Sequence, residues 1–160
     1  MRYAGIIPND LAAAPGVCVS VFTQGCPLRC LGCHNPETWS FSGGKEVSGD
    51  TINRVITLLQ ANNVHRNLCI MGGEPLCPEN QEFVKLLCQT VKSQLPNTKI
   101  YIWTGYTLED LLVKFPDTIP PILDMTTAIV DGPYIAELRD ITLHMRGSSN
   151  QRILYKGVDY

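Results

Sequence analysis

Residues 17–35 have the sequence Val17-Cys18-Val19-Ser20-Val21-Phe22-Thr23-Gln24-Gly25-Cys26-Pro27-Leu28-Arg29-Cys30-Leu31-Gly32-Cys33-His34-Asn35. The β-branched residues that alternate from Val17 to Phe22 predict a β-strand. This strand leads into a loop with three cysteines, separated by three residues and then by two. Thiolates are soft ligands suited to iron–sulfur clusters, zinc or copper(I), so the loop is a candidate metal centre.

The number of cysteines in this loop restricts the kind of metal centre. Structural zinc sites normally have four protein ligands, and ordinary [4Fe–4S] electron carriers use four cysteines. Three thiolates on a cubane would leave one iron free to bind a substrate. Two other interpretations stay open at this point: a chance cysteine cluster without metal, and a zinc site completed by His34 or Cys77.

Size and composition agree with one globular unit. We expect residues 1–160 to form a single domain that buries roughly 70% of its unfolded surface. A net charge of −2 and the lack of Lys or Arg runs give no reason to expect nucleic-acid binding. No apolar stretch approaches the ~18–20 residues that span a bilayer, and the N-terminus is not a convincing signal peptide. Seven cysteines, three of them clustered, do not suit a secreted disulfide framework, which favours a reducing cytoplasm.

Predicted strands and helices alternate along the rest of the chain. Further strands are expected at residues 68–71, 99–103 and 127–130, and helices at residues 51–61 with Asp50 as N-cap, 78–95 and 108–115. Residues 1–16 are expected to be irregular, and the tail around 146–155 is either a last strand or an ordered loop. Alternation favours parallel pairing with right-handed crossovers, and the chain is too short for the eight βα units of a closed barrel, which need about 250 residues. We therefore expect an α/β protein with a partial, open βα barrel and a mostly parallel sheet, whose open side could admit a large substrate.

Polar, glycine-containing turns follow the predicted strands, at 72–75, 104–106 and 131–134. Active sites in parallel sheets lie at this end of the strands. The glycines of Gly72-Gly73-Glu74-Pro75 would let the backbone approach a ligand closely, and Glu74 could accept a charge-assisted hydrogen bond from an ammonium group. Cys18 and Cys88 fall at predicted core positions, and the sequence does not determine whether Cys69 or Cys77 has a role beyond packing. Trp39 is open to two interpretations: a cover that excludes water from the metal centre, or a packing anchor.

The cysteine triplet and the Gly-Gly-Glu-Pro segment about 40 residues later together resemble the radical S-adenosylmethionine (SAM) superfamily. The resemblance implies that Cys26, Cys30 and Cys33 hold a [4Fe–4S] cluster, whose open iron chelates the amino and carboxylate groups of SAM. One electron from the reduced cluster would then break the bond from sulfur to the 5′ carbon, and a 5′-deoxyadenosyl radical would abstract a hydrogen atom. This resemblance counts strongly against zinc.

Other segments narrow the resemblance to one family. Pro-Glu-Thr-Trp at 36–39, Trp-Thr-Gly-Tyr at 103–106, Val-Asp-Gly-Pro-Tyr at 130–134 and Arg-Gly-Ser-Ser-Asn-Gln at 146–151 are similar to activating proteins of anaerobic ribonucleoside-triphosphate reductase. That similarity implies an activase that generates a glycyl radical on the large subunit of the reductase, with electrons from a low-potential donor such as flavodoxin. The alternatives are another small radical SAM enzyme, either a different glycyl-radical activase or a 7-carboxy-7-deazaguanine synthase, and a non-catalytic metal-binding module.

The resemblance also implies roles for single residues. Gly72, Gly73 and Glu74 would bind the methionine end of SAM, with further SAM contacts from Thr104 and Gly105. Asp131 resembles an aspartate that related activases place near the cofactor, sometimes beside a monovalent cation; Pro133 stands where those relatives often have a lysine, so no role of that lysine carries over. Gly32 replaces the aromatic residue that many superfamily members have before the last cysteine, so adenine would be contacted by backbone or by His34. Arg146 and Arg152 are either contacts to the reductase or ordinary surface charges.

Overall fold

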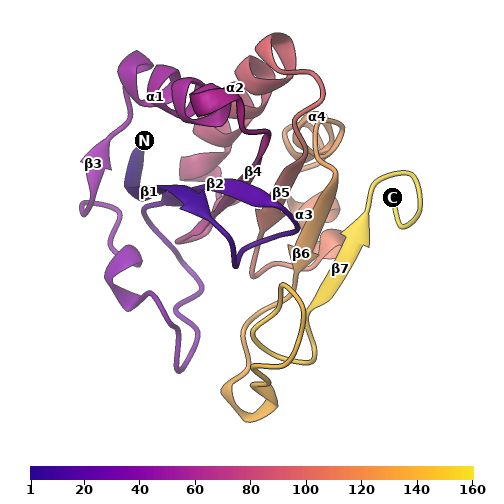
Figure 1. The fold of residues 1–160 in the computed structure, drawn as a ribbon. Helices are drawn as coiled ribbons and strands as arrows, with labels where there is room; N and C mark the ends of the chain where they lie inside the picture. Colours follow the sequence, from indigo (N-terminus) through magenta and orange to yellow (C-terminus); the bar gives the residue numbers. More distant parts are fainter.

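The computed structural model describes residues 1–160 and shows one seven-stranded sheet that does not close on itself (Figure 1). The strand order is β3-β1-β2-β4-β5-β6-β7. The strands are β1 (Arg2–Asp10), β2 (Val17–Thr23), β3 (Lys45–Glu46), β4 (Arg66–Gly72), β5 (Ile100–Trp103), β6 (Ala128–Asp131) and β7 (Arg152–Tyr155). The central strands β2, β4, β5 and β6 pair in parallel, whereas β1, β3 and β7 are antiparallel additions at the two edges.

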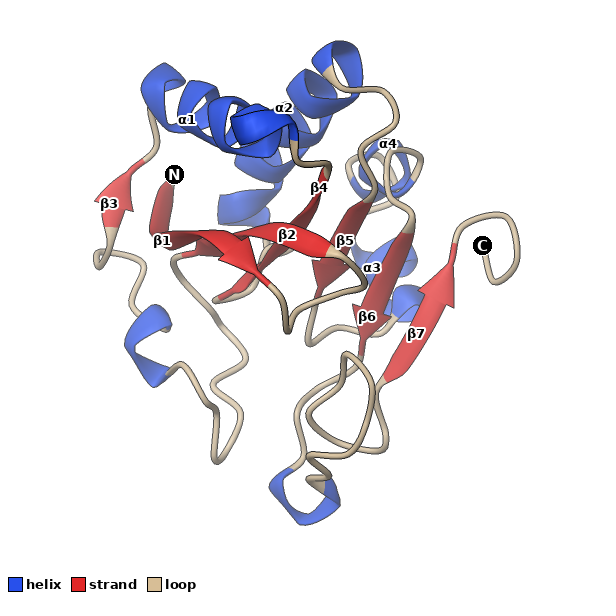
Figure 2. Cartoon of the chain, viewed as in Figure 1, coloured by secondary structure: helices blue, strands red, loops and turns tan.

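The longer helices lie together on one side of the sheet, and loops project from the end to which the parallel strands run (Figure 2). The helices are α1 (Gly49–Gln60), α2 (Pro78–Gln94), α3 (Leu108–Lys114) and α4 (Ile119–Leu123), with short 3₁₀ turns η1 (Pro36–Thr38), η2 (Ala61–Asn63) and η3 (Ala136–Leu138). No helix combines the length and the apolar character that crossing a bilayer requires.

The alternation of side chains along the strands divides the core into two unequal parts. Large residues such as Val21, Ile70 and Ile102 face the helices and belong to a core of 23 buried residues. Their neighbours on the opposite face form a cluster of only five buried residues, among them the small side chains of Cys18 and Cys69. Because successive strand residues point to opposite faces, the sequence places bulk under the helices and leaves the other face shallow.

Most predicted elements are confirmed with shifts of one or two residues at their ends, but three features differ from the expectation: strand β1, the start of α1 and helix α4. Residues 1–16 are irregular only in part, because β1 (Arg2–Asp10) pairs with β2, whereas residues 11–16 belong to no helix or strand. Pro8 made this segment look unlike a strand in the sequence, because proline cannot donate a backbone hydrogen bond. On the β2 side, Pro8 falls in a register shift between Ile7 and Asp10. On the other side, β3 pairs only with Arg2 and Tyr3. The missing N–H of Pro8 therefore interrupts no hydrogen bond of the sheet.

The other two differences concern helices. Helix α1 begins at Gly49 after the N-cap Ser48, whose backbone N–H donates to Thr51 Oγ1 at 3.1 Å, so the prediction of Asp50 as N-cap was wrong. Helix α4 was not predicted, because Pro120 and Pro121 occupy its first turn, where their missing N–H groups cost nothing. The tail forms β7, an antiparallel edge strand next to β6.

Candidate functional site

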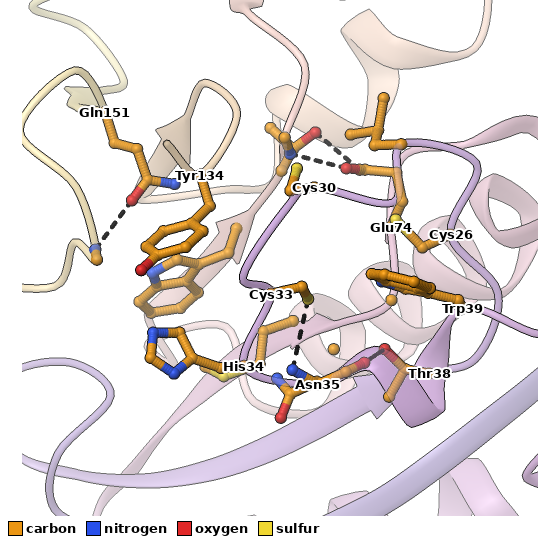
Figure 3. A pocket seen from close by; sticks show the side chains of 18 of the residues that line it. Cys26, Cys30, Cys33, His34, Asn35, Thr38, Trp39, Glu74, Tyr134 and Gln151 are labelled. Atoms are coloured by element: carbon orange, nitrogen blue, oxygen red, sulfur yellow. Dashed lines mark hydrogen bonds between the residues drawn. The ribbon is translucent and has the colours of Figure 1, made fainter. Parts of the chain in front are cut away.

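A pocket of about 240 Å³ opens where the parallel strands end (Figure 3). The loops after β2, β4, β5 and β6 contribute its walls, together with the segment before β7. Nine of the residues singled out in the sequence line this one pocket: Cys26, Cys30, Cys33, His34, Gly72, Gly73, Glu74, Thr104 and Gly105. The chain therefore brings together two motifs that lie about 40 residues apart in the sequence.

The three cysteines border the same open space in Figure 3. Cys26 is buried, and Cys30 and Cys33 are partly exposed. The backbone holds the start of the loop, because Cys26 N–H donates to the carbonyl of Trp39 at 3.1 Å. At the other end, Cys33 Sγ accepts a hydrogen bond from Asn35 N–H at 3.4 Å. Burial raises the pKa of the Cys26 thiol above its usual value.

The donor set suits an iron–sulfur cluster better than a single ion. A zinc ion needs its donors within about 2.0–2.3 Å of one point, and no group of three His, Cys, Asp or Glu side chains converges in that way. The irons of a cubane occupy separate corners, so its thiolate ligands surround a volume and need not meet at a point. Cys77, the alternative fourth zinc ligand, is buried and does not line the pocket.

Gly72 and Gly73 are required by the way the loops pack. A Cβ atom on Gly73 would lie 2.4 Å from the carbonyl oxygen of Gly25, and Gly72 has φ +106° with Thr23 backbone atoms 2.8 Å from an added Cβ. Hydrogen bonds join the same segments: Gly73 N–H donates to Thr23 O and Glu74 N–H to Gly25 O, both at 2.9 Å. The two glycines thus let the loop after β4 lie directly against the start of the cysteine loop.

The Glu74 carboxylate joins three segments of the site. It is 1% exposed, and Oε1 accepts hydrogen bonds from Leu76 N–H at 2.9 Å and from the Thr104 hydroxyl at 2.7 Å. Oε2 accepts one hydrogen bond, from Gly105 N–H at 2.7 Å. Burial raises the pKa of Glu74 to about 7, although these three donors favour the ionised form. A carboxylate has about four acceptor positions, so one remains for a ligand.

Asn80 is a structural residue of the site that sequence reasoning missed. It is 1% exposed near the start of α2, and its Nδ2 lies 2.9 Å from Glu74 O, 3.2 Å from Gln24 O and 3.3 Å from Gly25 O. This amide therefore binds the cysteine loop and the loop after β4 to the same helix. No motif in the sequence marks Asn80, because its partners are backbone carbonyls from distant segments.

The wall built by residues 132–151 explains a motif that had no mechanism at the level of sequence. Gln151 Oε1 accepts hydrogen bonds from the N–H groups of Gly147 at 2.9 Å and Ser148 at 3.2 Å, and its Nε2 donates to Gly132 O at 3.0 Å. Gln151 thus folds the Arg-Gly-Ser-Ser-Asn-Gln segment against the loop after β6. The ring of Tyr134 from that loop lies 5.3 Å from the imidazole of His34, edge to face.

Two of the predicted cofactor residues do not line the pocket. Asp131 is fully buried, and its carboxylate accepts hydrogen bonds from Leu108 N–H at 2.8 Å and from the guanidinium of Arg152 at 2.5 and 2.9 Å. Arg152 also binds Glu109 at 2.7 Å, so it fastens β7 to β6 and α3. Gly32 lies in the cysteine loop with φ +75°, and an added Cβ would be 3.3 Å from Ala136. The geometry supports a structural role for Asp131, Arg152 and Gly32.

Several pocket residues were not assigned to the site from the sequence: Leu28, Asn35, Thr38, Met71, Trp103, Gly132, Tyr134, Met145, Gly147 and Gln151. Trp39, left open between two interpretations, also lines the pocket. The other four cysteines do not line the pocket and are fully buried: Cys18, Cys69, Cys77 and Cys88. The prediction that Cys18 and Cys88 are core residues is confirmed.

An open α/β sheet with three cysteines around a pocket at its strand ends defines an iron–sulfur protein of one cluster. In agreement, a family model described as "4Fe-4S single cluster domain" matches residues 12–154. The chain is 36% identical to the anaerobic ribonucleoside-triphosphate reductase-activating protein of Vibrio cholerae, over 96% of this chain and 97% of that protein. It is 33% identical to the protein of that name from Salmonella typhimurium, over 94% and 96% of the two chains, and 34% identical to that of Enterobacteria phage T4, over 96% and 93%. The chain belongs to the family of anaerobic ribonucleoside-triphosphate reductase-activating proteins.

Proposed function

We propose that this protein is a radical SAM activase that generates a glycyl radical on anaerobic ribonucleoside-triphosphate reductase. The observation that carries the proposal is the shared pocket: three thiols of one loop border the same cavity as the loops at 72–74 and 104–105. The names of the relatives support the choice of the reductase as protein substrate. When bound and reduced, a [4Fe–4S] cluster supplies the single electron that cleaves SAM reductively.

The chain's own residues hold and orient the reactants. Cys26, Cys30 and Cys33 are the cluster ligands in this proposal, which leaves one iron for the amino and carboxylate groups of SAM. Glu74 has one acceptor position left after its three internal hydrogen bonds, and we assign it to the SAM ammonium group. Thr104 and Gly105 act through Glu74, because their hydroxyl and N–H fix its carboxylate.

The adenine ring has an aromatic wall available on one side of the pocket. His34 and Tyr134 line the cavity and meet edge to face, and in Figure 3 they lie across the open space from Trp39. Aromatic side chains present a flat apolar surface on which a base can stack. This arrangement supports the assignment of adenine to the side of His34. Gly32 and Asp131 remain outside this assignment.

The remaining features of the proposal concern partners and surroundings. The strand order leaves the sheet open, which suits a partial βα barrel of the radical SAM type within a single domain. The face opposite the helices is shallow, and a groove lined by Ala12, Leu143 and Met145 continues there from the pocket; we assign the approach of the reductase to this side. We further propose a flavodoxin-type electron donor, a cytoplasmic location, and no nucleic-acid or membrane partner.

The test is anaerobic reconstitution with iron and sulfide, reduction with dithionite, and assay of SAM cleavage, with and without the reductase. We expect methionine and 5′-deoxyadenosine from the wild type, and a glycyl doublet in electron paramagnetic resonance when the reductase is present. Cys30→Ala should abolish cleavage, whereas Cys18→Ala, which removes a fully buried thiol that does not line the pocket, should retain it.

Other outcomes would point to the competing functions. SAM cleavage without a glycyl signal on the reductase would favour a different radical SAM enzyme. A tetrahedral zinc, or a cluster with four protein ligands and no cleavage, would favour a metal-binding module. Cleavage that survives Cys30→Ala would contradict the ligand assignment.

A further inference from the structure

Trp39 lines the pocket and carries an unpaired hydrogen-bond donor. Its indole Nε1 is buried and has no acceptor in the protein. Only two other buried side-chain atoms share this condition, Asn67 Oδ1 and Asn150 Oδ1, and neither belongs to a residue that lines the pocket. A buried N–H without a partner costs about 1–3 kcal/mol, so such a group in a binding site indicates a missing acceptor.

The second tryptophan of the chain provides the contrast. Trp103 lines the same pocket, and its Nε1 donates to the backbone carbonyl of Met145 at 2.8 Å. One of the two indole N–H groups therefore has an acceptor within the protein, and the other has none. Both residues are partly exposed, so burial of the ring as a whole does not explain the difference.

The backbone of Trp39 is held to the candidate cluster ligand. Trp39 O accepts the N–H of Cys26 at 3.1 Å, and Thr38 O accepts the N–H of Gly25 at 2.8 Å. The Thr38 hydroxyl in turn donates to Asn35 O at 2.7 Å, which ties the segment to the end of the cysteine loop. The indole is thus fixed relative to the loop that begins at Cys26, and Figure 3 shows its ring beside that cysteine.

We propose that the Trp39 indole N–H donates a hydrogen bond to sulfur of the iron–sulfur cluster, either a cysteine thiolate or a bridging sulfide, and thereby raises the reduction potential. The inference rests on the ligand assignment of the proposed function. Sulfur atoms of the cluster are anionic acceptors, and reduction adds one negative charge. A donor therefore stabilises the reduced form more than the oxidised form. This effect makes it easier for a donor protein to load the electron that SAM cleavage consumes.

The experiment is a redox titration of the reconstituted protein without SAM, monitored by electron paramagnetic resonance. We expect Trp39→Phe to shift the one-electron reduction equilibrium about tenfold toward the oxidised cluster, a lowering of the midpoint potential by about 59 mV. Trp103→Phe is the matched control, because it also removes an indole N–H, but one that already has an acceptor; its shift should be much smaller. An equal shift in both variants, or none in Trp39→Phe, would overturn the proposal.

A second measurement separates a hydrogen bond from a packing effect. With ¹⁵N-indole tryptophan, the reduced wild type should show a hyperfine coupling in electron–nuclear double resonance that Trp39→Phe lacks. Benzothienylalanine at position 39 keeps the shape of the ring but lacks the N–H, so it should lower the midpoint potential as much as Trp39→Phe. It replaces Trp39→Phe in the titration if the phenylalanine variant assembles its cluster poorly. A shift that occurs only after SAM is added would assign the donor to SAM and contradict the proposal. Failure of the wild type to form a [4Fe–4S] cluster would instead refute the proposed function.

Discussion

Replacing Gly73 by alanine tests whether the glycines at 72–73 serve the ligand or the packing of the site. The added Cβ would lie 2.4 Å from Gly25 O and 2.9 Å from Gly25 C, whereas ordinary contact begins at 3.4 Å. Both atoms belong to backbone, so no side chain can turn away. The loop after β4 and the start of the cysteine loop must therefore separate by about 1 Å.

That separation also breaks hydrogen bonds. Glu74 N–H and the Asn80 amide donate to Gly25 O at 2.9 and 3.3 Å, and a retreat of about 1 Å takes both beyond hydrogen-bonding distance. Overpacking costs about 1–3 kcal/mol and each lost hydrogen bond about 0.5–1.5 kcal/mol, offset by about 0.4–1 kcal/mol because alanine restricts the unfolded chain. We expect a net loss of about 3 kcal/mol, or roughly 6–12 °C in melting temperature for a chain of this size.

The assay is urea unfolding and thermal melting of the metal-free protein, with iron content and SAM cleavage measured after reconstitution. Gly49→Ala is the control, because nothing lies within 4 Å of an added Cβ at this first residue of α1, and it should be neutral or slightly stabilising. A Gly73→Ala protein with wild-type stability but no SAM cleavage would refute the packing argument and favour the interpretation that the glycine serves the ligand alone.

Three further predictions follow from the hydrogen bonds of the site. Asn80→Ala should lower the free energy of unfolding by about 2 kcal/mol, because it removes the hydrogen bonds of a buried amide to three backbone carbonyls, and should reduce iron retention; unchanged iron content after gel filtration would argue against its role in holding the cysteine loop. The raised pKa of Glu74, about 7 when folded against 4.5 as the ordinary value, means that its contribution to stability is full below pH 4.5 and is lost as the pH rises through 7. Urea unfolding of the metal-free protein between pH 5.5 and 8 should therefore show a decline of about 2 kcal/mol that Glu74→Gln largely removes, and equal slopes for the two proteins would contradict this. Asp131→Asn should cost about 1–3 kcal/mol by weakening the hydrogen bonds to Arg152 and Leu108, and the wild type should melt at the same temperature in potassium and in tetramethylammonium salts; a rise in potassium would indicate a cation at Asp131.

Local patterns were sufficient to predict most of the framework. The alternation at 17–22 and the helical spacing at 108–115 depend on residues near one another in the chain, so the corresponding strand and helix were predicted to within one or two residues. Strand β1 was not predicted, because an apolar segment interrupted by Pro8 is also compatible with a loop. Whether this segment can pair in the sheet depends on which of its N–H groups face a neighbouring strand, and the segment's own sequence does not determine that.

The sequence by itself determined the chemistry of the centre, since three thiols spaced within eight residues restrict the ligand set whatever the fold. Only the tertiary structure decided which distant groups meet there: Glu74 with Thr104, Asn80 with the carbonyl of Gly25, and the unpaired indole of Trp39 beside the cysteine loop. It also showed that Asp131 forms an ion pair with Arg152. The physical reason is that the sequence gives side-chain types and their local spacing directly, whereas the partner of a buried polar group depends on how separate strand ends pack against one another.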